Sequence, residues 1–125
     1  MTSPTSRTKK LAESQGYTVA IVEKWNQWAK VRQDLFGFGD LLCMKPYEPL
    51  LLIQATTMDH FAHRLTKIQH TALSQHWLST GNRLEIWSWA TRGERGKRKL
   101  WTVKVHVCEP AEITPLSAIA IQGGV

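Results

Sequence analysis

Apolar residues in the first part of the chain change from helical spacing to a continuous run. Residues 5–15 place Leu11 and Ala12 among charged and polar residues and end before Gly16, which suits the position just after a helix. Residues 17–25 form a run rich in Val and Ile, which favours a buried strand. The pattern predicts a short helix, a glycine and then a strand.

Two further apolar runs occupy the middle of the chain. Residues 39–44 and 49–56 flank a Lys-Pro-Tyr-Glu-Pro segment whose prolines favour a turn, and together they predict a hairpin. Residues 25–37, which precede this hairpin, show no clean period. They predict a long connection, and long connections in compact domains are often functional.

Helical spacing returns after the hairpin. Apolar residues recur every three or four positions from Phe61 to Ala72, which predicts a helix that begins at Thr57 or Asp59 and ends near Ser79. The opposite face carries a stripe of basic and polar residues: His60, His63, Arg64, Lys67, His70 and Ser74. Such a stripe is either a solvated surface or a surface that follows a phosphate backbone.

Strong alternation of apolar and polar residues marks the segments 83–90 and 100–107, which predict a second hairpin. Its tip gathers cations that are opposed only by Glu94: Arg92, Arg95, Lys97, Arg98 and Lys99. The tip is either a solubilising turn or a contact for nucleic acid. Residues 111–125 have no period, which predicts a loosely attached or disordered tail after a domain of residues 1–110.

Length and charge narrow the choice of function. A chain of 125 residues predicts one domain, and 16 Lys and Arg against 10 Asp and Glu give a net charge of +6, which favours a polyanionic partner, DNA first. No run approaches the ~18 apolar residues of a membrane span, so we expect a cytoplasmic protein without a membrane partner. Cys43 and Cys108 lie in apolar segments, which predicts buried thiols rather than a disulfide.

Polar residues at the ends of the two middle strands are the first candidates for chemistry. Asp40 opens one strand, and Gln54 and Thr56 close the next. Because the strands are predicted to pair antiparallel, Asp40 should lie beside Gln54. A carboxylate next to carbonyl oxygens suits Mg²⁺ or Mn²⁺, which can activate water against a phosphodiester.

These segments carry a family resemblance. The stretch Asp-Leu-Phe-Gly-Phe-Gly-Asp-Leu-Leu, then Leu-Leu-Leu-Ile-Gln-Ala-Thr and a basic helix, resembles the PD-(D/E)XK nuclease superfamily, including Holliday junction resolvases and small phage and bacterial members. The resemblance covers roughly residues 9–107. It implies an α/β restriction-endonuclease-like fold, with an αβββαβ core and a mixed sheet flanked by helices, and a metal-dependent DNA endonuclease or resolvase-like hydrolase. A phage-encoded protein in the host cytoplasm would fit it.

The resemblance assigns roles residue by residue. Asp40 matches the metal-binding aspartate, Gln54 stands where the family has Asp or Glu, and Thr56 stands where it has Lys. An upstream acid, Glu13 or Glu23, would complete the metal ligands. Gln54 brings no negative charge, and Thr56 cannot stabilise an attacking hydroxide as an ammonium would.

Other side chains would compensate for these departures. Lys67 on the following helix would replace the missing lysine, with Arg64 behind it, and Asp34 would replace the lost carboxylate. Arg32, Arg64 and Lys67 would bind phosphate, together with the cationic hairpin tip. Trp25 and Trp28, in the connection that enters the site, are the Trp residues placed to stack on a base.

Two functions remain open at this point. The first is a Mg²⁺- or Mn²⁺-dependent nuclease, and a homodimer would fit it because two sites are needed to cut both strands. The alternative is a catalytically degenerate nuclease-fold protein that binds nucleic acid or a host factor without cutting, because Gln54 and Thr56 lack the usual charges.

Overall fold

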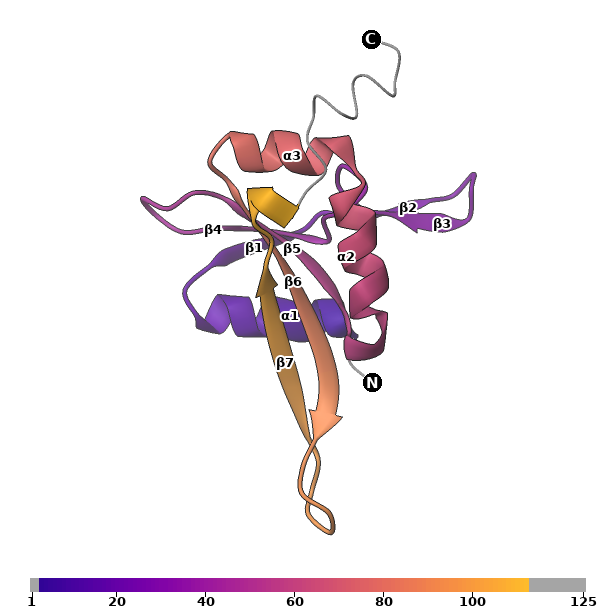
Figure 1. Ribbon diagram of the computed structural model, residues 1–125. Coiled ribbons are helices and arrows are strands. Elements are labelled where there is room, and N and C mark those ends of the chain that lie inside the picture. Colours follow the sequence, from indigo (N-terminus) through magenta and orange to yellow (C-terminus); the bar gives the residue numbers. More distant parts are fainter. Residues whose placement is uncertain (1–2, 113–125) are drawn as a thin grey trace.

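The computed structural model describes residues 3–112, which form one α/β domain around a mixed sheet (Figure 1). The sheet contains β1 (Thr18–Ile21), β4 (Leu41–Met44), β5 (Leu51–Thr57), β6 (Arg83–Arg92) and β7 (Leu100–Val107), in the order β1-β4-β5-β6-β7. The helices are α1 (Pro4–Ser14), α2 (Phe61–Gln69) and α3 (Ala72–Ser79), with the short 3-10 helices η1 (Met58–His60) and η2 (Pro110–Glu112). A separate hairpin pairs β2 (Lys24–Asn26) with β3 (Val31–Gln33).

The strand pairing follows from the lengths of the connections. β1, β4 and β5 pair antiparallel, as do β6 and β7, whereas β5 and β6 pair in parallel. Parallel neighbours need a long crossover, and α2 and α3 supply it. The helix α2 packs on one face of β5 and α1 packs on the other. All residues of β5 except the last are therefore buried.

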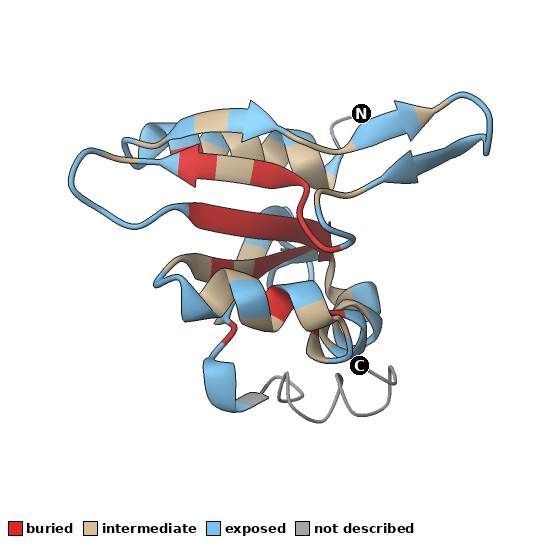
Figure 2. Ribbon diagram, turned by 90° about the horizontal axis from the view of Figure 1, so that it is seen from above, coloured by how far each residue is buried: buried red, intermediate tan, exposed pale blue. Residues whose placement is uncertain are grey.

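Alternate residues of β5 belong to two separate cores. Leu51 and Ile53 pack in a cluster that includes Ala12 of α1, and Leu52 packs in a cluster that includes Ile68 of α2. Because side chains alternate along a strand, Gln54 lies on the face that α2 covers. Buried residues gather in the central strands (Figure 2).

The predicted long helix is wrong in one respect, because it is interrupted between Gln69 and Ala72. The Thr71 hydroxyl donates to the Lys67 carbonyl at 2.6 Å, and Ser74 Oγ lies 2.8 Å from the Ile68 carbonyl. These side chains bind carbonyl oxygens that backbone N–H groups would bind in a continuous helix. The break shifts the phase of α3, so that Ser74 is buried rather than part of an exposed stripe.

Two predictions for residues 17–37 are also wrong. The strand predicted to be buried, β1, is an edge strand of the sheet that pairs only with β4, and most of it is exposed. The predicted long connection contains the β2–β3 hairpin. This hairpin packs no face against the core, so its sequence lacks the alternation of apolar and polar residues that would have predicted it.

The predicted α/β class, with a mixed sheet and flanking helices in a single domain, is confirmed. Both predicted hairpins form, as β4–β5 and β6–β7. The helix α1 ends just before Gly16, whose φ of +96° is readily adopted by glycine. Cys43 and Cys108 are buried and form no disulfide. No helix in residues 3–112 is long and apolar enough to cross a membrane. The predicted tail lies outside the described residues from position 113 onwards.

Candidate metal centre

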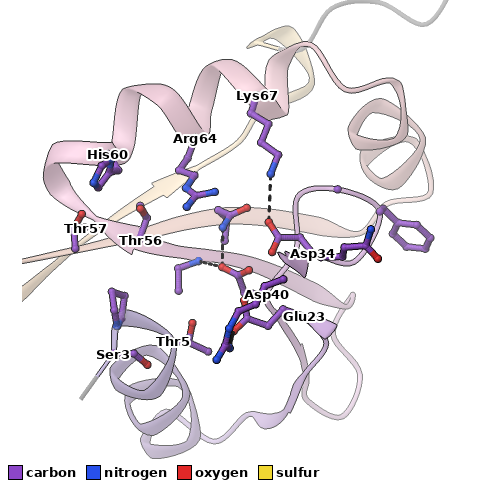
Figure 3. Close-up of a pocket in the computed structure, with 17 residues that line it drawn as sticks. Ser3, Thr5, Glu23, Asp34, Asp40, Thr56, Thr57, His60, Arg64 and Lys67 are labelled. Carbon is purple, nitrogen blue, oxygen red and sulfur yellow. Dashed lines mark hydrogen bonds and ion pairs between the residues drawn. The ribbon is translucent and has the colours of Figure 1, made fainter. Parts of the chain in front are cut away.

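A cavity of about 910 Å³ opens between the N-terminal end of α1, the second half of β5 and the helix α2 (Figure 3). It brings together most of the side chains that the sequence singled out: Glu23, Arg32, Asp34, Asp40, Gln54, Thr56, Arg64 and Lys67. They come from segments that lie up to 44 positions apart, from Glu23 to Lys67. The cavity is therefore a product of the tertiary structure.

Asp40 is held at the start of β4 by tight backbone packing. Its N–H donates to the Ile53 carbonyl at 2.9 Å, and the preceding Phe38 is fully buried. A Cβ on Gly39 would lie 2.5 Å from Leu52 Cδ1, and Leu52 has no space to move because it is fully buried. Glycine at position 39 thus allows β4 to approach β5 closely enough for Asp40 to face Gln54.

The Asp40 carboxylate is almost completely removed from water, with 3% of the residue exposed. Its Oδ2 accepts hydrogen bonds from Gln54 Nε2 at 2.7 Å and from the Ala55 N–H at 2.9 Å. Burial, followed by the hydrogen bond and the repulsion from Asp34, raises the pKa of Asp40 to about 8. Without a cation, this carboxyl group therefore holds a proton at neutral pH.

Three carboxylates meet at this point. One oxygen from each of Glu23, Asp34 and Asp40 lies within 4.8 Å of the others. Glu23 follows β1, Asp34 follows β3 and Asp40 precedes β4. The other acid considered from the sequence, Glu13, instead forms an ion pair with Lys9 at 3.2 Å on the exposed side of α1.

The hydrogen bonding of the Gln54 side chain indicates whether this cluster suits a metal ion. The residue is only 2% exposed and lines the cavity, yet its Oε1 has no hydrogen-bond partner among the described residues. Its Nε2 faces the Asp40 carboxylate, which leaves the carbonyl oxygen available. A buried hydrogen-bond acceptor without a partner lowers the stability of the folded state by about 1–3 kcal/mol. The three carboxylates form an all-oxygen set that suits a hard divalent cation, and the unpaired Gln54 Oε1 is a further oxygen atom in the lining of the same cavity.

Cations border the cavity but pair only with the outer carboxylates. Lys67 Nζ lies 3.5 Å from Asp34 Oδ2, and Arg32 Nη1 lies 2.9 Å from Glu23 Oε1. Arg64 also lines the cavity. Within residues 3–112, no basic side chain forms an ion pair with Asp40. Asp40, the innermost of the three carboxyl groups, is thus the one without a cationic partner among the described residues.

The cationic tip of the β6–β7 hairpin lies away from this cavity. The hairpin projects from the body of the domain (Figure 1), and its basic residues from Arg92 to Lys99 are all exposed. Lys97 pairs with Glu94 at 3.1 Å. None of the five predicted tip cations lines the cavity, so any contact they make with nucleic acid lies at a distance from the carboxylates.

Sequence reasoning missed the contribution of α1. Ser3, Pro4 and Thr5 line the cavity, with Ser3 Oγ accepting from the Ser6 N–H at 3.1 Å as an N-cap. The only signal in the sequence was Ser followed by Pro, which is typical of a helix start. It reports where a helix begins, but not what the helix end faces.

Comparisons of the chain with models of known protein families, with curated proteins and with solved structures found no match. The geometry of the cavity combines three clustered carboxylates that could hold a divalent cation with basic side chains at its border. Such an arrangement can bind a phosphate group beside a metal ion.

Proposed function

We propose that the protein is a metal-dependent nuclease with a restriction-endonuclease-like fold, which hydrolyses phosphodiester bonds of DNA. The observation that carries the proposal is Asp40, buried between two other carboxylates and beside the unpaired Gln54 Oε1. The order α1, β1, β4, β5, α2, β6, with β5 and β6 in parallel, supports it because the nuclease superfamily has an αβββαβ core.

Asp40, Asp34 and Glu23 would hold Mg²⁺ or Mn²⁺, with Gln54 Oε1 as a neutral ligand. When bound, the ion would polarise a phosphate oxygen and lower the pKa of a water molecule. The Ala55 N–H and Gln54 Nε2 hold the Asp40 carboxylate in one orientation through bonds of 2.9 and 2.7 Å. This positioning means that the carboxylate need not reorganise during the reaction.

Basic side chains at the border of the cavity would bind the substrate phosphate. Lys67 reaches the cavity from α2, two turns after the helix begins, and its ammonium lies 3.5 Å from Asp34. It would take the place of the lysine that the strand lacks at Thr56, and stabilise charge that develops on the phosphate. Arg64 and Arg32 would fix the orientation of the same phosphate group.

The neutral residue at position 54 favours a second candidate, a protein that binds nucleic acid without cutting it. Gln54 lowers the negative charge available for a metal ion, and Thr56 has no positive charge. Asp34 counters this, since it supplies a third carboxylate from the loop that precedes β4. We therefore rank hydrolysis first.

Cleavage of labelled duplex, single-stranded and four-way-junction DNA in Mg²⁺, Mn²⁺ or EDTA tests the proposal. Wild type should cut at least one substrate with metal and none in EDTA, and Asp40→Asn should abolish cutting while the fold is kept. Glu13→Gln is the matched control, because it removes a carboxylate of α1 that lies outside the cavity. Binding by wild type without cutting in either metal would instead favour the second candidate.

A further inference from the structure

The β2–β3 hairpin extends from the body of the domain as a two-stranded arm (Figures 1 and 2). It forms no strand pairs with the main sheet, and every residue from 24 to 33 except Asn26 is exposed. A hairpin of this length gains little stability by itself. Packing of its own side chains therefore does not explain its composition.

Local hydrogen bonds fix the turn of this arm. Asn26 Oδ1 accepts from the N–H groups of Trp28 and Ala29, both at 2.9 Å, and the Lys30 N–H donates to the Asn26 carbonyl at 2.8 Å. Lys30 adopts φ +58°, a left-handed conformation that closes the turn. Trp28 is thus held outward on an ordered backbone, which lowers the entropy lost when it binds a partner.

The arm combines exposed aromatic rings with positively charged side chains. Trp25 is 60% exposed and Trp28 is 88% exposed, whereas Trp87 and Trp89 are buried in the sheet. Residues 24–33 contain three cations and no acid: Lys24, Lys30 and Arg32. Aromatic faces beside cations complement the flat bases and charged phosphates of a nucleic acid strand whose bases are not paired.

The arm is also joined to the acidic cavity. Trp25 lies directly opposite Arg32 in the β2–β3 ladder, and Arg32 lines the cavity, where it pairs with Glu23. Side chains of directly opposite residues in a ladder lie on the same face. A strand whose phosphate sits in the cavity would therefore pass along the face that carries Trp25.

We infer that the β2–β3 hairpin binds unpaired nucleotides next to the phosphodiester bond that the cavity takes, with Trp28 and Trp25 stacked on bases and Lys24 and Lys30 on phosphates. The inference rests on the proposed function, which it deepens by naming the substrate class. The preferred substrate is a strand with unpaired bases, such as a single strand, a flap or a branch point, rather than an uninterrupted duplex.

Affinity for a fluorescein-labelled single strand and for its duplex, measured by anisotropy in EDTA, tests the inference. Trp28→Ala should weaken single-strand binding by about fivefold or more, and duplex binding by less than about twofold. Trp28→Phe, which keeps a ring, should retain most of the affinity. Tyr47→Ala is the matched control, because Tyr47 is a fully exposed aromatic residue at the other end of β4 from Asp40.

Equal single-strand affinity of wild type, Trp25→Ala and Trp28→Ala would overturn the inference. An equal loss for single strand and duplex would also overturn it, because stacking on unpaired bases discriminates between them. A change of oligomeric state with unchanged affinity would assign the arm to a protein partner instead, and would overturn it as well.

The two proposals fail in distinguishable ways. If Asp40→Asn abolishes cutting while Trp28→Ala leaves single-strand binding and cutting intact, the nuclease proposal stands and the inference fails. If single-strand binding depends on Trp28 but neither metal permits cutting, the inference about binding stands and the nuclease proposal fails.

Discussion

The two ends of β4 both carry clustered charges, but the clusters are built in opposite ways. At the end near Met44, Arg83 Nη2 lies 3.1 Å from the Tyr17 hydroxyl and 3.9 Å from Glu48 Oε1, and Lys45 Nζ lies 4.2 Å from the centre of the Tyr17 ring. At that end, the positively charged side chains lie beside a carboxylate and an aromatic ring, and all of these groups are at least partly exposed to solvent. At the other end, Asp40 is buried against other carboxylates.

The difference separates a compensated cluster from the cluster that we propose to be functional. Around Arg83, the guanidinium faces the Glu48 carboxylate and the Tyr17 ring, so its positive charge is compensated. Around Asp40, burial and repulsion between like charges raise the pKa and Gln54 Oε1 stays unpaired. Uncompensated burial, rather than charge density, therefore marks the site.

The largest effect should appear in the pH dependence of stability without metal. Because the pKa of Asp40 is raised from 3.8 to about 8, the folded protein keeps a proton that the unfolded chain releases. The free energy of unfolding should therefore fall by a few kcal/mol as pH rises from about 4 to about 8, and level off above that. Denaturant unfolding of wild type, Asp40→Asn and the Glu13→Gln control in EDTA measures this.

Asp40→Asn should remove most of this fall, because the variant has no proton to lose at position 40. Glu13→Gln should keep it. A wild-type curve that stays flat between pH 4 and 8 would show that Asp40 is not held in a protonated state.

Divalent metal should reverse the effect of pH at the acidic end of β4. At pH 8, Mg²⁺ or Mn²⁺ at a hundred times its Kd should stabilise wild type by about 2.7 kcal/mol, because the ion binds only the folded state. Thermal unfolding with and without metal measures the gain. Asp40→Asn should gain much less, and equal gains in both proteins would place the metal elsewhere.

We propose that Lys67 binds the substrate phosphate beside the acidic centre, so its removal should affect turnover more than metal binding. Lys67→Met should lower kcat by about 100-fold, since the ammonium would no longer stabilise charge on the phosphate. The metal concentration for half-maximal activity should not increase, because Asp34 loses a competing cation. Lys9→Met, on the exposed face of α1, is the control. Unchanged kcat would exclude Lys67 from the reaction.

The cationic hairpin tip should contribute less than Lys67, and in a different way. Replacing Arg95 and Arg98 with Ala should weaken duplex binding and reduce the slope of log Kd against log salt by about 0.9 for each phosphate that the tip no longer neutralises. Titrations at several salt concentrations measure the slope. An unchanged slope would identify the tip as a solubilising turn.

The smallest effect should come from the compensated cluster at the Met44 end. Tyr17→Phe removes the hydroxyl that Arg83 contacts, and should lower stability by only about 0.5–1.5 kcal/mol, because Arg83 keeps Glu48 as a partner. Cleavage should stay at the wild-type level. A large loss of cleavage would contradict the division between the two ends of β4.

The sequence alone determined those features that depend on local patterns. Alternation and apolar runs were enough to predict both hairpins, and the Gly-Asp pair before an apolar run was enough to place Asp40 at a strand start opposite Gln54. Each of these depends on neighbours within one hairpin. Backbone periodicity and turn chemistry report on such neighbours directly.

Only the tertiary structure decided which distant side chains meet Asp40. Glu13 and Glu23 were both candidates by sequence, and the pairing of β1 with β4 brings Glu23 to the cavity while Glu13 stays on the outer face of α1. The break before α3 likewise depends on the hydroxyls of Thr71 and Ser74, which compete with backbone N–H groups for the same carbonyls. Long-range packing chooses between alternatives that the local sequence pattern does not distinguish, and no period in the sequence records that choice.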